Sequence, residues 1–535
     1  MKKASILSLI LFIGFVLRSI GLDFPSIGYH NMKENEYLSM AEEMARTKDF
    51  ITKRICFYNA FDEETVTKLY PQPPLISYQA LISWKLFGNN LWGPRLINVL
   101  FGLAAIVVIY LVAHLLFCEI KWALLCAFLL AIIPLAVFFS RNLQPESPAF
   151  FFMLLGNLFY LKFAASLKKN HLFYGGLFLS IAWLYKLSFL IGLLPVVLCL
   201  PFKALFKEKK ELYKFVLIFL SSYAVLFISV VWLMRIGQWH FDYQSTSSRI
   251  KILEVFYSAY WKKYAGVIWW YITEENFTLP FVLLSILGTV IAFIKRKGLL
   301  NRYIIGWTLS LIPYCMMFSD YINQHNYYQM PFLTLICIAT VYATLFISET
   351  VRKFIKKSIF LALVIFIIGV AISPIYTAVT RMYGKVFLGE DVAGESLKEL
   401  TLDQERIFLL THCQGQAIAR YAARYTGWPS GLEDFKEKEE KFKIRYICVY
   451  PADFLENLGE TPSLLSYIQD NYRIKELGLI KQGESTYKIV YLILKRGNGG
   501  MDIEKIVNSN LDKIKIRKIY RILGKTVLFF TIRVP

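Results

Sequence analysis

The sequence predicts an α-helical polytopic membrane protein with about eleven transmembrane helices and a small C-terminal α/β domain. Three observations lead to this fold class. Hydrophobic residues make up 56% of the 535 residues, above the roughly 45–50% usual for soluble domains. The excess lies in repeated apolar runs, and a helix needs about 20 mostly apolar residues to cross a bilayer. After about residue 380, short β-rich and helix-like segments replace these runs.

The predicted spans follow one another along the first 376 residues. They lie at about 4–22, 91–117, 122–140, 147–165, 172–185, 187–202, 213–234, 277–294, 303–319, 329–348 and 358–376. The fifth and sixth are short, so 172–202 is either a thin hairpin or one bent element. The N-terminus has the basic start and apolar stretch of a signal peptide, but no small-residue cleavage site follows, and we interpret it as an uncleaved first span.

The basic residues give the orientation of the spans. The net charge of +21 does not indicate a nucleic-acid partner, because most Lys and Arg lie in short loops between apolar runs. With Lys2 and Lys3 in the cytoplasm, every basic cluster between spans falls on that side, as the positive-inside rule requires. We therefore predict a multi-pass protein of the cell membrane, inner or plasma, with a cytoplasmic N-terminus. The segments placed outside are the loop 23–90, the turn 140–147, the aromatic-rich loop 235–276 and the segment 319–331.

The domain organisation follows from this topology. Residues 1–380 form the transmembrane domain with the first outer loop 23–90, and residues 381–535 form the extracytoplasmic α/β domain. In the second domain the predicted strands are 406–412, 445–450 and 487–494, and the predicted helices are 415–427 and 463–472. A disulfide between Cys413 and Cys448 is one possibility there. The basic tail 502–535 lies either on anionic lipid or in solvent.

The loop 23–90 opens with a helix predicted from about Met32 to Thr47. Asn31 suits its N-cap, and Glu34, three residues later, completes a capping-box pattern. On a helical wheel Glu34 shares the apolar face with Tyr37, whereas Glu36 lies nearly opposite and is expected to be solvated. A carboxylate on an inward face is costly without a partner or a role. Glu34 is therefore either a functional residue or a helix cap.

Other charged residues mark the outer ends of spans. Arg141 and Glu146 flank the turn 140–147, and Glu146 also suits the positive N-terminus of the next helix. Lys186 interrupts two apolar runs, where a cation either meets an anion such as a lipid phosphate or extends to the membrane interface. Four more residues lie at outer helix ends: Arg95, His325, Tyr327 and Tyr328.

Several of these residues belong to an ordered set of short motifs over about residues 1–340. The set is Glu34 with Tyr37, Pro73-Pro74-Leu75, Phe87-Gly88 with Arg95-Leu96, Ser140-Arg141 with Pro145-Glu146, Tyr185-Lys186, and His325 with Tyr327-Tyr328 before Pro331. In this order it resembles the GT-C superfamily of polyprenyl-phosphate-sugar-dependent glycosyltransferases, above all the protein O-mannosyltransferases and the lipid A aminoarabinose transferases. Two departures stand out. Lys33-Glu34 replaces the common Asp-Glu, and Pro71-Gln72 replaces the Glu-Lys of the aminoarabinose transferases, whose Lys binds phosphate.

The resemblance implies an inverting transfer of a sugar from a polyprenyl-phosphate donor to a hydroxyl of a protein, lipid or envelope glycan on the extracytoplasmic face. It implies Glu34 as the general base, and because Gln72 replaces the phosphate-binding Lys, Arg141 and Lys186 are the candidate ligands of the donor phosphate. Residues implied in substrate binding or support are Tyr37, Arg95, Glu146, His325, Tyr327 and Tyr328. No cofactor is required, although Glu34 and Glu146 could share a divalent metal.

Two other classes of function compete with this interpretation. A lipid or glycan transporter, such as a flippase, would bind a similar lipid, but the sequence shows no clear internal repeat of the kind transporters have. A scaffold or sensor would use the outer loop and the soluble domain as a ligand site without turnover. The chain has no Walker loop, no GxGxxG after a strand, no HExxH and no GxSxG, so soluble nucleotide chemistry has no visible site.

Overall fold

The computed structural model describes residues 2–51, 73–205, 209–235, 254–351, 357–411, 415–457, 462–481, 486–510 and 513–534. The chain divides into two compact units. The membrane unit comprises Met1–Asp23 and Pro71–Met382, and the sheet unit comprises Phe24–Tyr70 and Tyr383–Pro535. The described start of the predicted outer loop, residues 24–51, thus groups with the C-terminal residues, which the sequence did not indicate.

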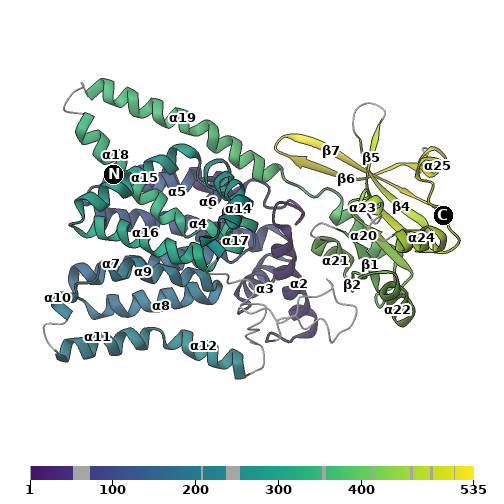
Figure 1. The fold of residues 1–535 in the computed structure, drawn as a ribbon, viewed down its shortest axis with the longest axis horizontal. Helices are drawn as coiled ribbons and strands as arrows, with labels where there is room; N and C mark the ends of the chain where they lie inside the picture. Colours follow the sequence, from purple (N-terminus) through teal and green to yellow (C-terminus); the bar gives the residue numbers. More distant parts are fainter. Residues whose placement is uncertain are drawn as a thin grey trace. The chain divides into compact units, whose positions relative to one another are not determined.

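In the membrane unit, every predicted span corresponds to helical structure (Figure 1). The helices in these spans are α1 (Lys2–Ser19), α4 (Trp92–Phe117), α5 (Ile120–Ile132) with α6 (Pro134–Phe139), α7 (Glu146–Ser166), α8 (Lys169–Tyr185), the 3-10 helix η1 (Leu187–Gly192) with α9 (Leu193–Val197), α11 (Lys209–Ser222) with α12 (Ala224–Arg235), α15 (Leu279–Lys295), α16 (Leu299–Met317), α18 (Phe332–Val351) and α19 (Lys357–Gly384). Shorter elements lie between them: α3 (Leu75–Phe87), α10 (Phe202–Leu205), η2 (Glu254–Phe256), α14 (Ser258–Trp270), the π-helical turn η3 (Tyr271–Asn276), α17 (Ser319–Gln324) and the 3-10 turn η4 (Asn326–Gln329).

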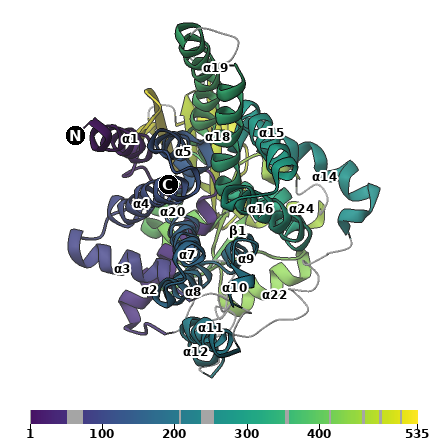
Figure 2. The same ribbon diagram turned by 90° about the vertical axis from the view of Figure 1, so that its left-hand side faces the viewer.

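The helices of the membrane unit pack side by side, and Figure 2 looks along several of them. The predicted span 122–140 is broken because Pro134 holds the preceding Ile133 in an extended conformation, with ψ 127°. Gly288 lets α15 approach α18 closely, since a Cβ at this position would collide with the carbonyl oxygen of Ala339.

By length and composition, three helices in the described part of the chain can cross a membrane: α4, α7 and α18. The number rises to five if each of two bent pairs is one span, one made of α11 and α12 and the other of α14 to α15. The multi-pass architecture is therefore confirmed, and the count of about eleven spans stays a prediction.

The sheet unit contains a seven-stranded mixed sheet with the strand order β2-β1-β3-β5-β4-β7-β6. The strands are β1 (Ile407–Leu410), β2 (Thr426–Gly427), β3 (Tyr446–Val449), β4 (Tyr472–Lys481), β5 (Tyr487–Arg496), β6 (Lys515–Ile522) and β7 (Lys525–Arg533). Strands β2, β1 and β3 are parallel, and the other neighbours pair antiparallel.

Helices cover both faces of this sheet, and an apolar core lies between the sheet and the helices on each face. On one face lie α20 (Glu390–Leu400) and α21 (Gln416–Ala422), and on the other lie α22 (Leu432–Phe442) and α24 (Pro462–Asn471). The unit also contains α2 (Asn31–Thr47), α23 (Phe454–Asn457) and α25 (Ile503–Asn508). The α/β architecture predicted for the C-terminal region is thus present.

Two expectations about this region gain a structural setting. The basic tail is part of the sheet, because β6 and β7 form a hairpin that pairs with β4, and both alternatives for its exposed surface, anionic lipid or solvent, stay predictions. Cys448 is a free, buried thiol in β3, and burial raises the pKa of this thiol. Its suggested disulfide partner, Cys413, lies outside the described residues.

Candidate functional site

The helix α2 carries the predicted base in the sheet unit. It begins and ends within one residue of the prediction, but its N-cap is His30, at φ 56°, and not Asn31. Asn31 instead donates a hydrogen bond to the carboxylate of Glu390. The predicted capping box is therefore wrong, because the cap residue is used in a contact far away in sequence.

Glu34 is buried, with 4% of its surface exposed, and its Oε2 accepts a hydrogen bond of 2.6 Å from the Ser26 hydroxyl. Tyr37 is buried on the same helix, as the wheel predicted. The expectation for Glu36 was wrong, since this residue is also buried and pairs with Lys33 at 2.7 Å. Hydropathy within one helix could not show that a second face of α2 is covered by protein.

A residue that the sequence did not single out, Arg420 of α21, contacts the polar face of α2. It donates to Glu42 from Nε at 3.0 Å and from Nη2 at 2.7 Å, and from Nη1 to Asn35 at 3.3 Å. Burial by itself lowers the pKa of Arg420, but Glu42 and Glu34 favour the cation, and the pKa lies above its ordinary value. Glu34 thus lies in the electrostatic field of a buried guanidinium. Asn35 and Glu42 are two helical turns apart, so the sequence could have shown that they share one face of α2. No nearby residue indicates that Arg420 is their partner.

Glu390 at the start of α20 is fully buried beside this group. Burial raises the pKa of Glu390 well above its ordinary value, and the hydrogen bond from Asn31 only partly opposes this. Its Oε1 has no hydrogen-bond partner among the described residues. The uncharged carboxylic acid is the form that this site favours.

Replacing Glu390 with glutamine is expected to stabilise the protein at alkaline pH. Because burial raises the folded-state pKa above the unfolded one, the stability that Glu390 contributes is complete below the unfolded pKa and is lost as pH rises toward the folded pKa. The melting temperature of Glu390→Gln should be several degrees above that of wild type at pH 8, since a stability change of about 1 kcal/mol shifts the melting temperature by roughly 2–4 °C in a domain of 150–250 residues. Near pH 4.5 the two proteins should have the same melting temperature. As a control, Glu437→Gln at an exposed position should have the melting temperature of wild type at both pH values. A melting temperature of Glu390→Gln below wild type at pH 8 would contradict this.

The membrane unit contains a second group, which we call the lysine cluster: Glu146, Lys186, His325, Tyr327 and Tyr328. Lys186 lies between α8 and η1, is 6% exposed, and forms an ion pair with Glu146, the first residue of α7. Its Nζ also lies 4.5 Å from the ring centre of Tyr327 and 3.9 Å from that of Tyr328. Cation–π contacts of this kind gain strength away from water. The ring of His325 stacks on Tyr327 with centroids 5.1 Å apart.

Hydrogen bonds hold the turn η4, which carries both tyrosines. Asn326 donates to buried Glu275 at 2.7 Å, and Asn276 donates to Gln329 at 2.9 Å. The hydroxyl of Tyr314 donates to the backbone carbonyl of Tyr328 at 2.6 Å. The two ring faces next to Lys186 are thus held in place by η3 and α16.

The two predicted arginines lie elsewhere in the membrane unit. Arg95 donates to the carbonyl of Leu22 at 2.9 Å, and Arg141 donates to the carbonyl of Gly21. Both are buried and hold the backbone that follows α1. The turn with Arg141 is in turn fixed by Asn98, which donates to the carbonyl of Gln144 at 2.8 Å.

The structure therefore brings together Lys186 with Glu146 and the three aromatic residues, and it brings Arg95 and Arg141 to one backbone segment. Glu34 and Tyr37 lie in the sheet unit. Within the described residues no group of three or more His, Cys, Asp or Glu side chains could hold a metal ion. A metal shared by Glu34 and Glu146 stays a prediction.

Comparison with known proteins bears on this arrangement. Residues 33–244 match the family dolichyl-phosphate-mannose-protein mannosyltransferase, a range that includes Glu34, Arg141 and Lys186. An uncharacterized protein from Aquifex aeolicus is 27% identical over 246 residues, which is 44% of this chain and 44% of that relative. The chain thus matches less than half the length of this curated relative.

Two solved structures resemble nearly the whole chain. The archaeal oligosaccharyltransferase AglB from Archaeoglobus fulgidus, in complex with an inhibitory peptide and a dolichol-phosphate, is similar with a TM-score of 0.54 at 13% identity, over 94% of this chain and 75% of AglB. ArnT from Cupriavidus metallidurans is similar with a TM-score of 0.54 at 12% identity, over 92% of this chain and 98% of ArnT. The chain has a GT-C fold. The predicted resemblance to the GT-C superfamily is confirmed, and a second ArnT structure, with a TM-score of 0.52, was solved with undecaprenyl phosphate bound.

Proposed function

We propose that this GT-C protein is an inverting glycosyltransferase of the cell membrane. It takes a sugar from a polyprenyl-phosphate donor and transfers it to a hydroxyl of a protein, lipid or glycan acceptor on the extracytoplasmic face. The observation that carries the proposal is the lysine cluster, a buried cation with its charge held by Glu146 and by two tyrosine rings. A buried ammonium group held by a carboxylate and two aromatic rings can also donate a charge-assisted hydrogen bond to a phosphate oxygen of the donor, which is a phosphodiester.

The proposed reaction is a direct displacement at the anomeric carbon of the donor sugar. Glu34 accepts the proton of the acceptor hydroxyl as its oxygen forms a bond to the anomeric carbon on the face opposite the phosphate. The bond from the anomeric carbon to the phosphate oxygen breaks, and its electron pair leaves with polyprenyl phosphate. Lys186 stabilises the charge that grows on this leaving group, as preorganised cations do in phosphoryl chemistry. Arg141 is the second candidate for this role, and Arg95 keeps the backbone beside it in place.

The experiment that tests the proposal measures product formation. The full chain, reconstituted in nanodiscs, is given a radiolabelled polyprenyl-phosphate sugar and candidate acceptors, and labelled product is separated from the donor. Transfer of label to an acceptor supports a glycosyltransferase. Movement of intact labelled donor across liposomes without product would instead establish a flippase, and binding without either would establish a ligand sensor.

The guanidinium of Arg420 is expected to keep Glu34 in the ionised form that a base needs. A nearby cation favours the carboxylate, so Arg420→Gln should move the acidic limb of the pH–rate profile to higher pH and reduce activity several-fold on that limb. The acidic limb of the pH–rate profile measures this, and Arg420→Lys should restore it because the charge returns. Arg424→Gln serves as a control for damage to the sheet unit, since Arg424 is buried and donates to Thr401. A fall in activity with an unmoved limb would leave Arg420 with a packing role only.

A further inference from the structure

The hairpin β6–β7 combines three features that its place in the sheet does not require. The first is its composition. It forms one edge of the sheet, and the stretch 513–534 contains basic residues but no Asp or Glu. An exposed edge strand with cationic side chains avoids pairing with other strands, so charge alone is ordinary there.

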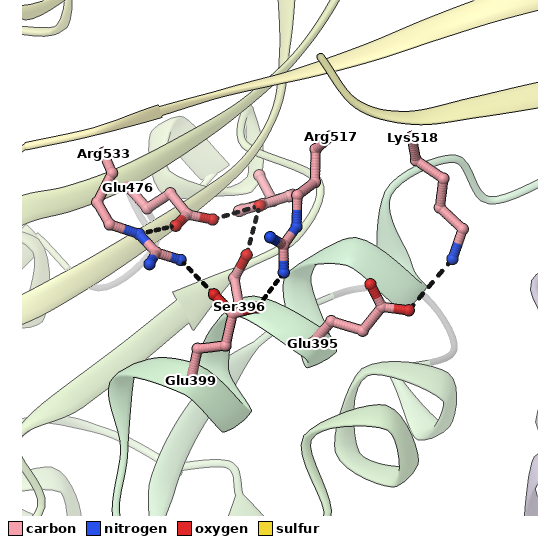
Figure 3. Close-up of polar contacts among 8 residues, drawn as sticks. Glu395, Ser396, Glu399, Glu476, Arg517, Lys518 and Arg533 are labelled. Carbon is pink, nitrogen blue, oxygen red and sulfur yellow. Dashed lines mark hydrogen bonds and ion pairs between the residues drawn. The ribbon is translucent and has the colours of Figure 1, made fainter. Parts of the chain in front are cut away.

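Five of the seven basic residues in this stretch fall into two sets, and Lys513 and Lys515 lie at its start, away from the turn. One set is neutralised inside the unit: Arg517 pairs with Glu399, Lys518 with Glu395, and Arg533 with both Glu476 and Glu399 (Figure 3). The other set, Arg521 and Lys525, is exposed beside the turn and has no ion-pair partner among the described residues. These two cations are therefore available to an external anion.

The second feature is apolar exposure beside these cations. Ile519 is 54% exposed and Leu523 is 44% exposed. Single exposed apolar residues are common on soluble proteins, but here they alternate with cations along one short hairpin. Cationic and apolar side chains on one surface are the combination that binds a membrane interface.

The third feature is the turn itself. Leu523 and Gly524 connect the strands, and both have positive φ, 48° and 81°. A two-residue turn with two positive φ values favours Asn-Gly or Gly-Gly, and a bulky residue with positive φ is strained. Leucine at this position does not help the turn and its side chain is partly exposed, so the fold of the hairpin by itself does not explain this residue.

The residues next to the hairpin indicate a role for this leucine. A Cβ on Gly384, the last residue of α19, would lie 3.9 Å from the Leu523 side chain. Phe24, five residues after the end of α1, packs against Tyr520 with ring centroids 6.2 Å apart. Both neighbours follow predicted membrane spans closely in sequence. At 1.5 Å per residue, α19 extends roughly 12 Å beyond the predicted span 358–376. The tip therefore lies next to the two chain segments that join the sheet unit to predicted spans, one after α1 and the other at the end of α19.

We propose that the tip of the β6–β7 hairpin docks on the anionic lipid surface of the membrane that the chain spans. Leu523 and Ile519 enter the interfacial layer, and Arg521 and Lys525 bind lipid phosphates. This anchoring fixes the sheet unit at the bilayer surface.

Photo-crosslinking in the full chain tests this inference. The reporter p-benzoyl-phenylalanine replaces Ile519, and in a control protein it replaces exposed Glu440 on α22. Each protein is reconstituted in nanodiscs of phosphatidylglycerol or of phosphatidylcholine, irradiated and analysed for lipid adducts by mass spectrometry. We expect at least five-fold more adduct at 519 than at 440 in phosphatidylglycerol, and less at 519 in phosphatidylcholine.

Leu523→Asn separates docking from folding. It creates the favoured Asn-Gly turn, so the thermal stability should be unchanged or higher while the adduct yield at 519 falls toward the control. Arg521→Gln and Lys525→Gln should each weaken docking roughly five-fold. Equal yields at 519 and 440, equal yields in the two lipids, or an adduct to a second copy of the protein in place of lipid would each overturn the inference.

Discussion

Replacing Glu34 with glutamine is expected to lower the rate of sugar transfer by about 10²–10⁴-fold, the contribution typical of a positioned general base. The amide has nearly the same shape as the carboxylate and can still accept the hydrogen bond from Ser26, so α2 should keep its place. It cannot take the acceptor proton. Donor affinity should stay close to wild type, because the proposed phosphate ligands, Lys186 and Arg141, both lie in the membrane unit and not on α2.

The matched control is Glu36→Gln on the same helix. Glu36 is as buried as Glu34, at 5% against 4% exposed, and pairs with Lys33. This variant removes a buried carboxylate without removing the proposed base, so its turnover should remain within a few-fold of wild type. Single-turnover transfer from labelled donor measures both. Equal activity of Glu34→Gln and wild type would remove Glu34 as the base, and an equal loss in both variants would point to general damage of α2.

The sequence predicted α2 well because helix periodicity and propensity are local properties. It failed on the cap and on Glu36 because both depend on distant residues. Asn31 is taken by Glu390, more than 350 residues later, and Glu36 is covered by protein that a helical wheel does not include. The same reason explains why Arg420 was missed.

The C-terminal sheet shows a similar division. Strands β1, β3 and β5 were predicted because they are short apolar runs with β-branched residues. The hairpin β6–β7 is not predictable in this way, since its basic side chains alternate with apolar ones in a pattern shared by amphipathic surface segments. The segment is a hairpin of the sheet because it pairs with β4 and forms ion pairs with α20, and both contacts involve residues distant in sequence.

In the membrane unit, topology predicted which residues lie at outer helix ends, and the structure shows which of them meet. Lys186 had two explanations, a phosphate partner or extension to the interface. It is buried on an internal carboxylate and two rings, and its binding of a donor phosphate stays a prediction. The position of Glu146 at the first turn of α7 satisfies the helix dipole and the lysine together, so these roles are not alternatives.

Because Glu146 has both roles, we expect Lys186→Met to lower the free energy of unfolding more than the other single substitutions considered. It leaves the Glu146 carboxylate buried without its cation, and breaking one side of a buried pair typically costs about 3–5 kcal/mol. The melting temperature of the variant in detergent should be far below that of wild type. The double variant Lys186→Met with Glu146→Gln removes both charges and should recover most of this stability, because a neutral pair of similar size leaves no uncompensated charge.

The double variant also separates packing from phosphate binding. If Lys186 binds the donor phosphate, the refolded double variant should bind polyprenyl phosphate at least ten-fold more weakly than wild type, since a charge-assisted hydrogen bond is absent whatever the stability. Binding can be measured with labelled polyprenyl phosphate on the protein in nanodiscs, and Glu146→Gln alone reports the effect of the carboxylate. Wild-type affinity in the double variant would mean that Lys186 only holds α7 against η4. The phosphate would then have to be sought at Arg141, which binds the backbone after α1 and whose Arg141→Met variant should in that case lose donor affinity by itself.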